Sequence, residues 1–189
     1  MAQLKPKVAI IGAGIAGLSC ATHLAEKDIH ATVFEKSKGV GGRTSTRRVE
    51  PNLSFDHGAQ YFTVRTPILQ SFVNSWENLG VVSEWKGRIV KLNNKEITGT
   101  EIIPRYVGTP GMTAMAADLA KNLEIKKETK ILEVKPSSNQ WTLLDEAGVA
   151  YNGFDHLVVA LPAPQTGELL ANHPVGKIAS STPMAPCWA

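Results

Sequence analysis

Apolar residues in the first 35 positions pass from a continuous run to a helical spacing and then to an alternating pattern. The run at 8–11 (VAII) predicts a strand that is buried on both faces of a parallel sheet. Four apolar residues then recur at the spacing of an amphipathic helix: Leu18, Ala21, Leu24 and Ala25. Residues 29–34 alternate, which predicts a second strand that ends at Glu35. This order predicts an α/β fold, a Rossmann-like dinucleotide-binding domain with a parallel sheet.

Three glycines occupy the turn between the first strand and the helix in the pattern G-x-G-x-x-G. Gly12 permits a tight turn, Gly14 leaves the backbone open to a pyrophosphate, and Gly17 allows the helix to pack closely on the sheet. Free N–H groups at the helix N-terminus attract phosphate. Glu35 lies 18 residues after Gly17, where an acid accepts hydrogen bonds from a ribose 2′-hydroxyl. Chance can place three glycines at this spacing, but the strands and the acid in register predict a site for NAD or FAD rather than NADP.

A second glycine-rich loop, KSKGVGGRTSTRR at 36–48, follows the acid. Its glycines expose backbone N–H groups, and an arginine offers phosphate two parallel donors. A second set of phosphate donors so close to the first suits a long cofactor whose pyrophosphate is contacted from two sides. The loop therefore favours FAD, with Gly41, Gly42 and Arg43 as the donors, whereas the side chains of Arg47 and Arg48 can equally be solvated.

Further along the chain, a helix is predicted after Thr66-Pro67 and ends before Gly80. One face of this helix is apolar: Ile68, Leu69, Phe72, Val73, Trp76 and Leu79. Residues 81–107 contain short strand-like runs, which predict an antiparallel hairpin inserted into the dinucleotide fold.

Thr109-Pro110 predicts the start of another helix. One face of that helix would carry Met112, Met115, Ala116, Leu119 and Leu123. A small meander is expected from strands at 130–135, 140–145 and 149–152. The apolar run at 157–161 predicts a return to the parallel sheet, ended by Pro162.

The charge balance is mild, with 20 Lys and Arg against 17 Asp and Glu and a net charge of +3, which does not indicate a nucleic-acid partner. Two cysteines exclude a disulfide framework and a cysteine metal site, and suit a reducing compartment. No run of 18 apolar residues is present, so we expect no membrane partner. These features predict a soluble, cytoplasmic protein that acts on a small molecule; its oligomeric state is left open.

Asp56-His57 is the nearest approach to an acid–base pair. Neighbouring residues on a strand point to opposite faces, so we expect no dyad, although His57 alone could transfer a proton. The sequence has no HExxH, C-x-x-C or nucleophile-elbow motif, and we assign neither a metal site nor a catalytic residue. Cys20 is expected to be a small buried apolar residue, and Cys187 has no assigned role.

Six motifs occur along most of the chain in the order of one known family: the glycine pattern at 12–17, Glu35, GGR at 41–43, DHGAQYFT at 56–63, VGTPGMTAMAADLAKNL at 107–123 and FDHLVVALPAPQTGELL at 154–170. The chain resembles the flavin-containing amine oxidase superfamily and, within it, the renalase-like proteins. The two glycine motifs are typical of flavoproteins of this type, and GAQYF and LPAPQ narrow the resemblance toward the renalase-like members.

The resemblance implies that FAD is the cofactor and that matching residues contact it. Backbone at Gly14, Ala16 and Gly17 would meet the pyrophosphate, Glu35 the adenosine ribose, Arg43 a phosphate, and the backbone of Ile131 the adenine. Gln60 and Tyr61 would approach the flavin, although simple loop packing also accounts for them. The expected cofactor-binding set is Gly12, Gly14, Ala16, Gly17, Glu35, Lys36, Gly41, Gly42, Arg43, Thr44, Ala59, Gln60, Tyr61 and Ile131.

The implied activity is that of an oxidoreductase that takes a hydride from a reduced nicotinamide isomer or an amine and passes electrons to oxygen. A non-catalytic FAD- or NAD-binding module and another amine oxidase or desaturase-like flavoprotein are the alternatives. We expect residues 1–65 and 106–189 to form a discontinuous FAD-binding domain and 66–105 to form part of a substrate domain. Members of the family run well beyond 189 residues, so the chain is expected to be a fragment or a natural truncation.

Overall fold

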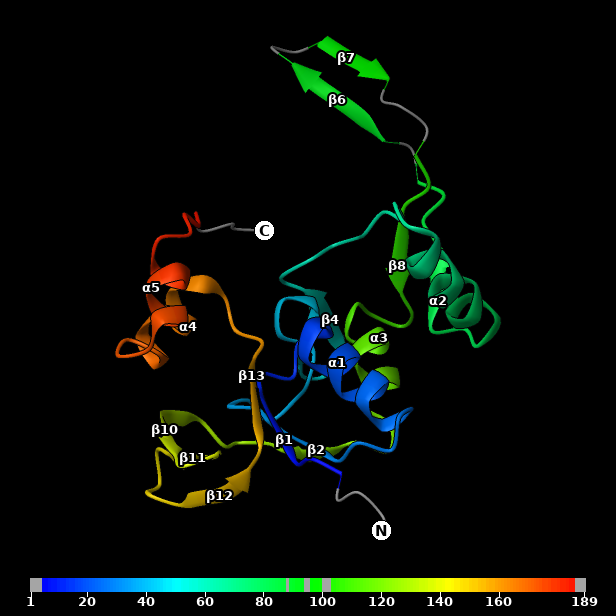
Figure 1. Cartoon of the computed structure of the whole chain (residues 1–189). Coiled ribbons are helices and arrows are strands. Elements are labelled where there is room, and N and C mark those ends of the chain that lie inside the picture. Colours follow the sequence, from blue (N-terminus) through cyan, green and yellow to red (C-terminus); the bar gives the residue numbers. More distant parts are fainter. Residues whose placement is uncertain (1–4, 88, 94–95, 100–102, 186–189) are drawn as a thin grey trace.

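The computed structural model describes residues 5–87, 89–93, 96–99 and 103–185, and a four-stranded parallel sheet lies at its centre (Figure 1). The strand order is β13-β1-β2-β9. The strands are β1 (Val8–Ile11), β2 (Ala31–Phe34), β9 (Glu124–Lys126) and β13 (His156–Val159). The chain winds outward from β1 through β2 to β9 and then returns to the other side of β1, which makes β1/β13 the switch point where such folds bind ligands. The predicted α/β fold class is confirmed.

The side chains of β1 alternate between two separate hydrophobic cores, which explains why the whole strand is apolar. Val8 and Ile10 contact the core formed with helices α1 (Ile15–Ala25) and α3 (Thr113–Leu119). Ala9 and Ile11 face the other core, on the opposite side of the sheet. Cys20 on α1 is half-buried against the first core rather than fully buried as expected.

The second core lies under an antiparallel meander rather than under helices. Its strands are β10 (Ile131–Ser137), β11 (Gln140–Asp145) and β12 (Ala150–Phe154). Phe34 of β2 packs against the meander: its ring lies 4.9 Å from the ring of Tyr151 and 5.9 Å from that of Phe154, both edge-on. The predicted meander is confirmed to within two residues at each strand end.

Helix α2 (Pro67–Asn78) begins as predicted, with the Thr66 hydroxyl accepting a hydrogen bond from the Leu69 N–H at 3.3 Å. Its middle turns pack into the first core through Val73 and Trp76. The predicted apolar face is too wide, because Ile68 is 72% exposed and Leu79 is 64% exposed. Both residues lie at the helix ends, beyond the turns that contact the core.

The segment after α2 is antiparallel, as predicted. Strand β5 (Val82–Glu84) pairs with β8 (Tyr106–Gly108), and β6 (Val90–Asn93) pairs with β7 (Glu96–Gly99). The β6–β7 hairpin projects away from the parallel sheet (Figure 1). The helix expected at Thr109-Pro110 begins only at Thr113, because the backbone first turns sharply between Gly108 and Gly111, where a side chain on Gly108 would overlap the Gly111 carbonyl.

The remaining elements are the 3₁₀ turn η1 (Gly42–Thr44), the hairpin β3 (Thr46–Val49) and β4 (Leu53–Asp56), and the helices α4 (Ala163–Leu169) and α5 (Pro174–Ser180). Side chains of α2 and β5 share the first core with α1 and α3. The division into two domains therefore stays a prediction. Cys187 lies outside the described residues.

Candidate functional site

The two predicted glycine loops lie against each other at the carboxyl ends of β1 and β2. The Gly41 N–H donates a hydrogen bond to the Ala13 carbonyl at 2.8 Å, and Gly14 and Gly41 form a parallel bridge. A Cβ on Gly42 would lie 3.4 Å from the Cα of Gly14. Segments nearly 30 residues apart in sequence thus form one continuous backbone surface at the N-terminus of α1.

Gly12 and Gly17 are required by the packing of the chain itself. Gly12 has a φ of +106°, and a Cβ there would lie 2.9 Å from the Ala160 carbonyl oxygen at the end of β13. A Cβ on Gly17 would overlap the Gly12 carbonyl oxygen. The structure shows the tight turn and the close helix packing that the glycine spacing predicts.

Gly14 is different, because nothing in the described chain lies within 4 Å of the place where its Cβ would be. Its φ of −78° and ψ of 176° are open to any residue, so backbone strain does not require glycine there. Gly14 is the N-cap of α1, and the first N–H groups of a helix have no partner within the helix. A bare backbone, unpaired donors and an exposed Ala16 make this surface accessible to an anion.

Glu35 holds both loops in place, a role that the sequence analysis missed. The residue is only 7% exposed; its Oε2 accepts the Ala13 N–H at 2.9 Å and its Oε1 accepts the Ser37 N–H at 2.8 Å. The Glu35 carbonyl also accepts the Thr129 N–H at 2.9 Å, which brings the segment that enters Ile131 alongside. Each carboxylate oxygen can accept a second bond, so contact of Glu35 with a ribose remains a prediction.

Arg43 is exposed in η1, and its side chain makes no hydrogen bond or ion pair with another described residue. Its carbonyl accepts the Ala59 N–H at 2.8 Å, and a side chain on Gly58 would overlap that carbonyl. The hydroxyl of Thr44 donates back to the Gly41 carbonyl at 3.0 Å, and Lys36 is exposed. This loop therefore presents a cation and is linked directly to the segment that leads into Gln60 and Tyr61.

Tyr61 and Ile131 occupy contrasting settings. The Tyr61 ring is 41% exposed and is flanked by Trp85 and by the guanidinium of Arg105, while Gln60 is also exposed. Ile131 begins β10, and its side chain is buried in the second core. Only its backbone is therefore available for the predicted adenine contact.

Asp56 has a structural role, and the structure supports no Asp56-His57 dyad. Its Oδ1 accepts the Thr46 hydroxyl and the Met112 N–H, the latter at 3.0 Å, which attaches the β3–β4 hairpin to the turn before α3. His57 is exposed. Among the described residues, no group of three His, Cys, Asp or Glu side chains could hold a metal ion.

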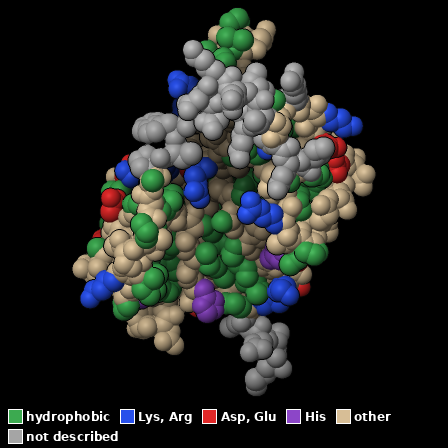
Figure 2. Space-filling view, turned by 90° about the horizontal axis from the view of Figure 1, so that it is seen from above, with side chains coloured by type: hydrophobic (Ala, Val, Ile, Leu, Met, Phe, Trp, Pro, Cys, Tyr) green, Lys and Arg blue, Asp and Glu red, His purple; other side chains and the backbone are tan. Residues whose placement is uncertain are grey.

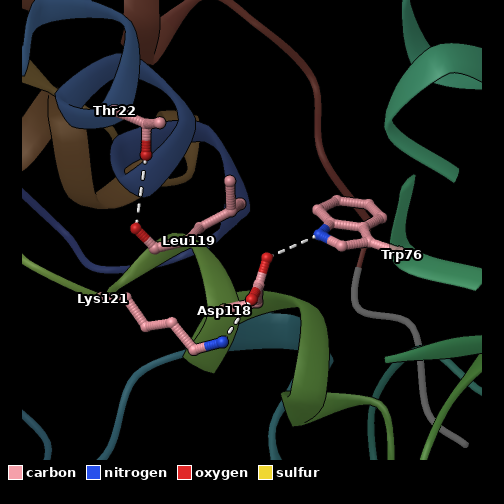
Figure 3. A network of polar contacts seen from close by, with 5 residues as sticks. All are labelled: Thr22, Trp76, Asp118, Leu119 and Lys121. Carbon is pink, nitrogen blue, oxygen red and sulfur yellow. Dashed lines mark hydrogen bonds and ion pairs between the residues drawn. The ribbon is translucent and has the colours of Figure 1, made fainter. Parts of the chain in front are cut away.

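Polar contacts hold α3 against α1 and against α2 (Figure 3). Asp118 accepts Trp76 Nε1 at 2.9 Å and Lys121 Nζ at 2.7 Å, and the Thr22 hydroxyl donates to the Leu119 carbonyl at 3.3 Å. Burial raises the pKa of Asp118, but the hydrogen bonds from Lys121 and Trp76 outweigh burial, so its pKa lies below the ordinary value. The Thr22 bond links α3 to α1, the helix whose N-terminus forms the glycine-loop surface, while the Asp118 bonds link α3 to α2.

Two hollows of the described chain lie away from the glycine loops. One, of about 310 Å³, lies at the amino ends of the strands beside Ile29, His30 and Glu124. The other, of about 170 Å³, lies beside Trp141 and His173. Neither hollow is lined by the glycine loops. Figure 2 shows one face of the molecule, with hydrophobic side chains gathered in its hollowed middle and Lys and Arg around them.

Residues 10–76 match the family described as NAD(P)-binding Rossmann-like domain. The chain is 31% identical over 127 residues to 15-cis-phytoene desaturase of Synechococcus elongatus, which covers 66% of this chain and 26% of that enzyme. The solved structure named "Putative protoporphyrinogen oxidase" from Exiguobacterium sp. 255-15 superposes with a TM-score of 0.72 at 12% identity, over 95% of this chain and 64% of the other. A triple mutant of putrescine oxidase gives 0.68 at 15% identity, over 87% and 60%.

These likenesses concern a part of each relative. The chain spans about a quarter of the desaturase and less than two thirds of each of the two oxidase structures. At this identity the two structures show a shared fold. The flavin-containing amine oxidase and renalase-like assignments are therefore left to the proposal below. No helix within the described ranges is both long and apolar enough to cross a bilayer.

Proposed function

We propose that the chain binds FAD, with the pyrophosphate lying on the surface formed by the two glycine loops. The hydrogen bond from Gly41 N–H to the Ala13 carbonyl carries this proposal, because it places the second loop directly against the first. This bond uses the Gly41 N–H, so Gly41 is not the phosphate donor that the sequence predicts, and Gly42 and Arg43 would supply the donors of the second loop. A site for a shorter dinucleotide needs only the first set. The second set, with the exposed Arg43, suits a cofactor that continues past the first loop toward Tyr61.

The residues present fit this cofactor. Gly14 leaves open the surface that the pyrophosphate would approach, and Gly42 passes so close to Gly14 that a side chain would narrow it. The backbone at Gly14, Ala16 and Gly17 would hold the pyrophosphate together with Arg43. Glu35 would receive the ribose, and the backbone at Ile131 the adenine.

The proposed activity is that of a renalase-like oxidoreductase, in which a reduced nicotinamide isomer or an amine is the hydride donor and oxygen is the final acceptor. The bound flavin would supply the redox chemistry, and the protein would bind and orient both partners. The named relatives support this class, since one is a desaturase and two are oxidases by name. The chain's own part is to fix the cofactor through its backbone and to expose the Gln60–Tyr61 segment beside it.

Absorbance spectroscopy and FAD titration of the purified protein test the proposal. We expect a flavin band at about 450 nm in the purified protein, or saturable uptake of added FAD with a matching change in flavin fluorescence. NAD and NADP should compete weakly. A folded protein that takes up no FAD contradicts the proposal.

Anaerobic mixing of the FAD-loaded protein with donors tests the activity. Reduced nicotinamide isomers and primary amines are added separately, and bleaching of the flavin band is followed before oxygen is admitted and peroxide is measured. We expect bleaching by a nicotinamide isomer. Bleaching by amines alone would leave the amine as the donor and favour the alternative of another amine oxidase, and bound flavin that no donor reduces contradicts the oxidoreductase.

A further inference from the structure

Three residues from separate segments meet at the base of the inserted β5–β8 sheet. Tyr61 follows β4, Trp85 follows β5 and Arg105 precedes β8. The backbone N–H of Trp85 donates to the Arg105 carbonyl at 2.7 Å, and Phe62 and Tyr106 exchange two backbone hydrogen bonds of 2.9 Å. The backbone therefore fixes the positions of all three side chains.

Arg105 carries a cation that lacks an anionic partner within the described chain. Its Cζ lies 5.2 Å from the centroid of the Tyr61 ring, within the range of a cation–π contact. Its Nε–H is buried and has no hydrogen-bond acceptor among the residues that the structure describes. A buried donor on a charged group is costly without an acceptor, so this geometry calls for an acceptor that the described residues do not supply.

The aromatic neighbours of Arg105 leave ring surface exposed. Tyr61 is 41% exposed and Trp85 is 43% exposed, and their ring centroids lie 5.9 Å apart. Within the described ranges, neither the Tyr61 hydroxyl nor the Trp85 indole N–H makes a hydrogen bond. Exposed rings and free donors beside a guanidinium suit a planar compound that carries a negative group.

The cluster also lies next to the proposed cofactor site. Ala59 is hydrogen-bonded to the carbonyl of Arg43, and Tyr61 follows two residues later. A compound bound at the cluster would therefore lie beside the segment that leads away from the phosphate-binding loop.

We propose that Tyr61, Trp85 and Arg105 form the part of the substrate site that binds a carboxylate or phosphate group of a planar substrate. This assignment to the substrate rests on the proposed FAD-dependent function. Arg105 forms the paired hydrogen bonds that carboxylate and phosphate share, and the two rings contact the planar portion. Arg105 thereby sets specificity for anionic over neutral substrates.

Calorimetric titration of the FAD-loaded protein with two matched pairs of probes tests the proposal. Phenylacetate with phenylacetamide tests a carboxylate, and nicotinamide mononucleotide with nicotinamide riboside tests a phosphate. In at least one pair, we expect the member that carries the carboxylate or phosphate to bind about tenfold more tightly than the member that lacks it, with quenching of tryptophan fluorescence. R105Q should abolish that preference, and R105K should keep part of it. The matched control R48Q, at an exposed arginine of β3, should keep all of it.

FAD affinity is measured on every variant and should not change. Equal binding of both members in both pairs overturns the proposal, as does a preference that survives in R105Q. Loss of FAD by folded R105Q in parallel with the probe would assign Arg105 to the cofactor and also overturn it. Should R105Q fail to fold, the R105K titration decides, since equal binding of both members of each pair by folded R105K would overturn the proposal. A wild-type protein that binds no FAD contradicts the proposed function, while titration of that same protein with the probes still tests the anion site.

Discussion

Glycines in the loop after β1 serve two different purposes, and the contrast between them separates the fold from the site. Gly12 and Gly17 leave no room for a side chain, because a Cβ at either position would meet the chain's own backbone. Gly14 has open space at the same place and ordinary backbone angles. The packing of the chain therefore explains two of the three glycines, and the proposed cofactor would account for the third. The predictions below test where this division runs.

Gly17→Ala should have the largest effect on stability. The new Cβ would overlap the Gly12 carbonyl, and α1 would have to shift away from the sheet. We expect a loss of about 3 kcal/mol or more in the free energy of unfolding. Urea denaturation followed by circular dichroism measures it. An unchanged midpoint would show that the helix does not pack as closely as the structure has it.

Glu35→Gln should destabilise both glycine loops. A glutamine amide presents N–H₂ to one of the two backbone N–H groups that the carboxylate now accepts. We expect a loss of about 2 kcal/mol in the free energy of unfolding and weaker FAD binding. The same denaturation series with Glu133→Gln, at an exposed position on β10, gives the reference. Equal free energies of unfolding for the two variants would contradict the structural role of Glu35.

Arg43→Ala should affect the ligand alone. The side chain contacts no described residue through a hydrogen bond or ion pair, so stability should change by less than about 0.5 kcal/mol. FAD affinity should fall about tenfold, or ~1.4 kcal/mol, because a charge-assisted contact with phosphate is lost. Fluorescence titration at two salt concentrations measures this, with Arg48→Ala as the control. Equal FAD affinity in both variants would contradict the assignment of the second loop.

Acid should weaken the contact that holds α3 against α2. The pKa of Asp118 is lowered in the folded chain, so its contribution is complete above the ordinary value of 3.8 and is lost as the pH falls through the lowered folded-state pKa. Asp118→Asn should lower stability at pH 7 by about 1 kcal/mol and lose less stability than the wild type between about pH 5 and pH 2. Thermal melts across that range provide the measurement. Parallel pH profiles would show that Asp118 contributes nothing.

Much of the nucleotide-binding half is predictable because local patterns encode it. The strand of 8–11, the glycine spacing and the helix that follows all lie within one stretch of chain, and the structure places them as expected. The hydrogen bonds of Glu35 to Ala13 and Ser37 were not predictable, because they require β1 and β2 to be side by side. A terminal acid in this pattern indicates only a ligand contact.

Long-range pairing also explains the other differences. Arg105 lies 44 positions from Tyr61 in the sequence, and the two meet only because residues 62 and 106 pair. The late start of α3 depends on the packing of Gly108 against Gly111. The exposure of Ile68 follows from which turns of α2 reach the core. Periodicity identified α2 and its apolar residues, but the partner that each one meets is a property of the whole fold.

FAD affinity and stability of Gly14→Val, measured together, test the central claim most directly. Gly99→Val, at another glycine with open space and no positive φ, is the matched control on β7, far from the glycine loops. The account predicts that both variants unfold within about 0.5 kcal/mol of the wild type and that Gly14→Val alone loses FAD affinity by tenfold or more, ~1.4 kcal/mol. Wild-type FAD affinity in a folded Gly14→Val protein would contradict the account.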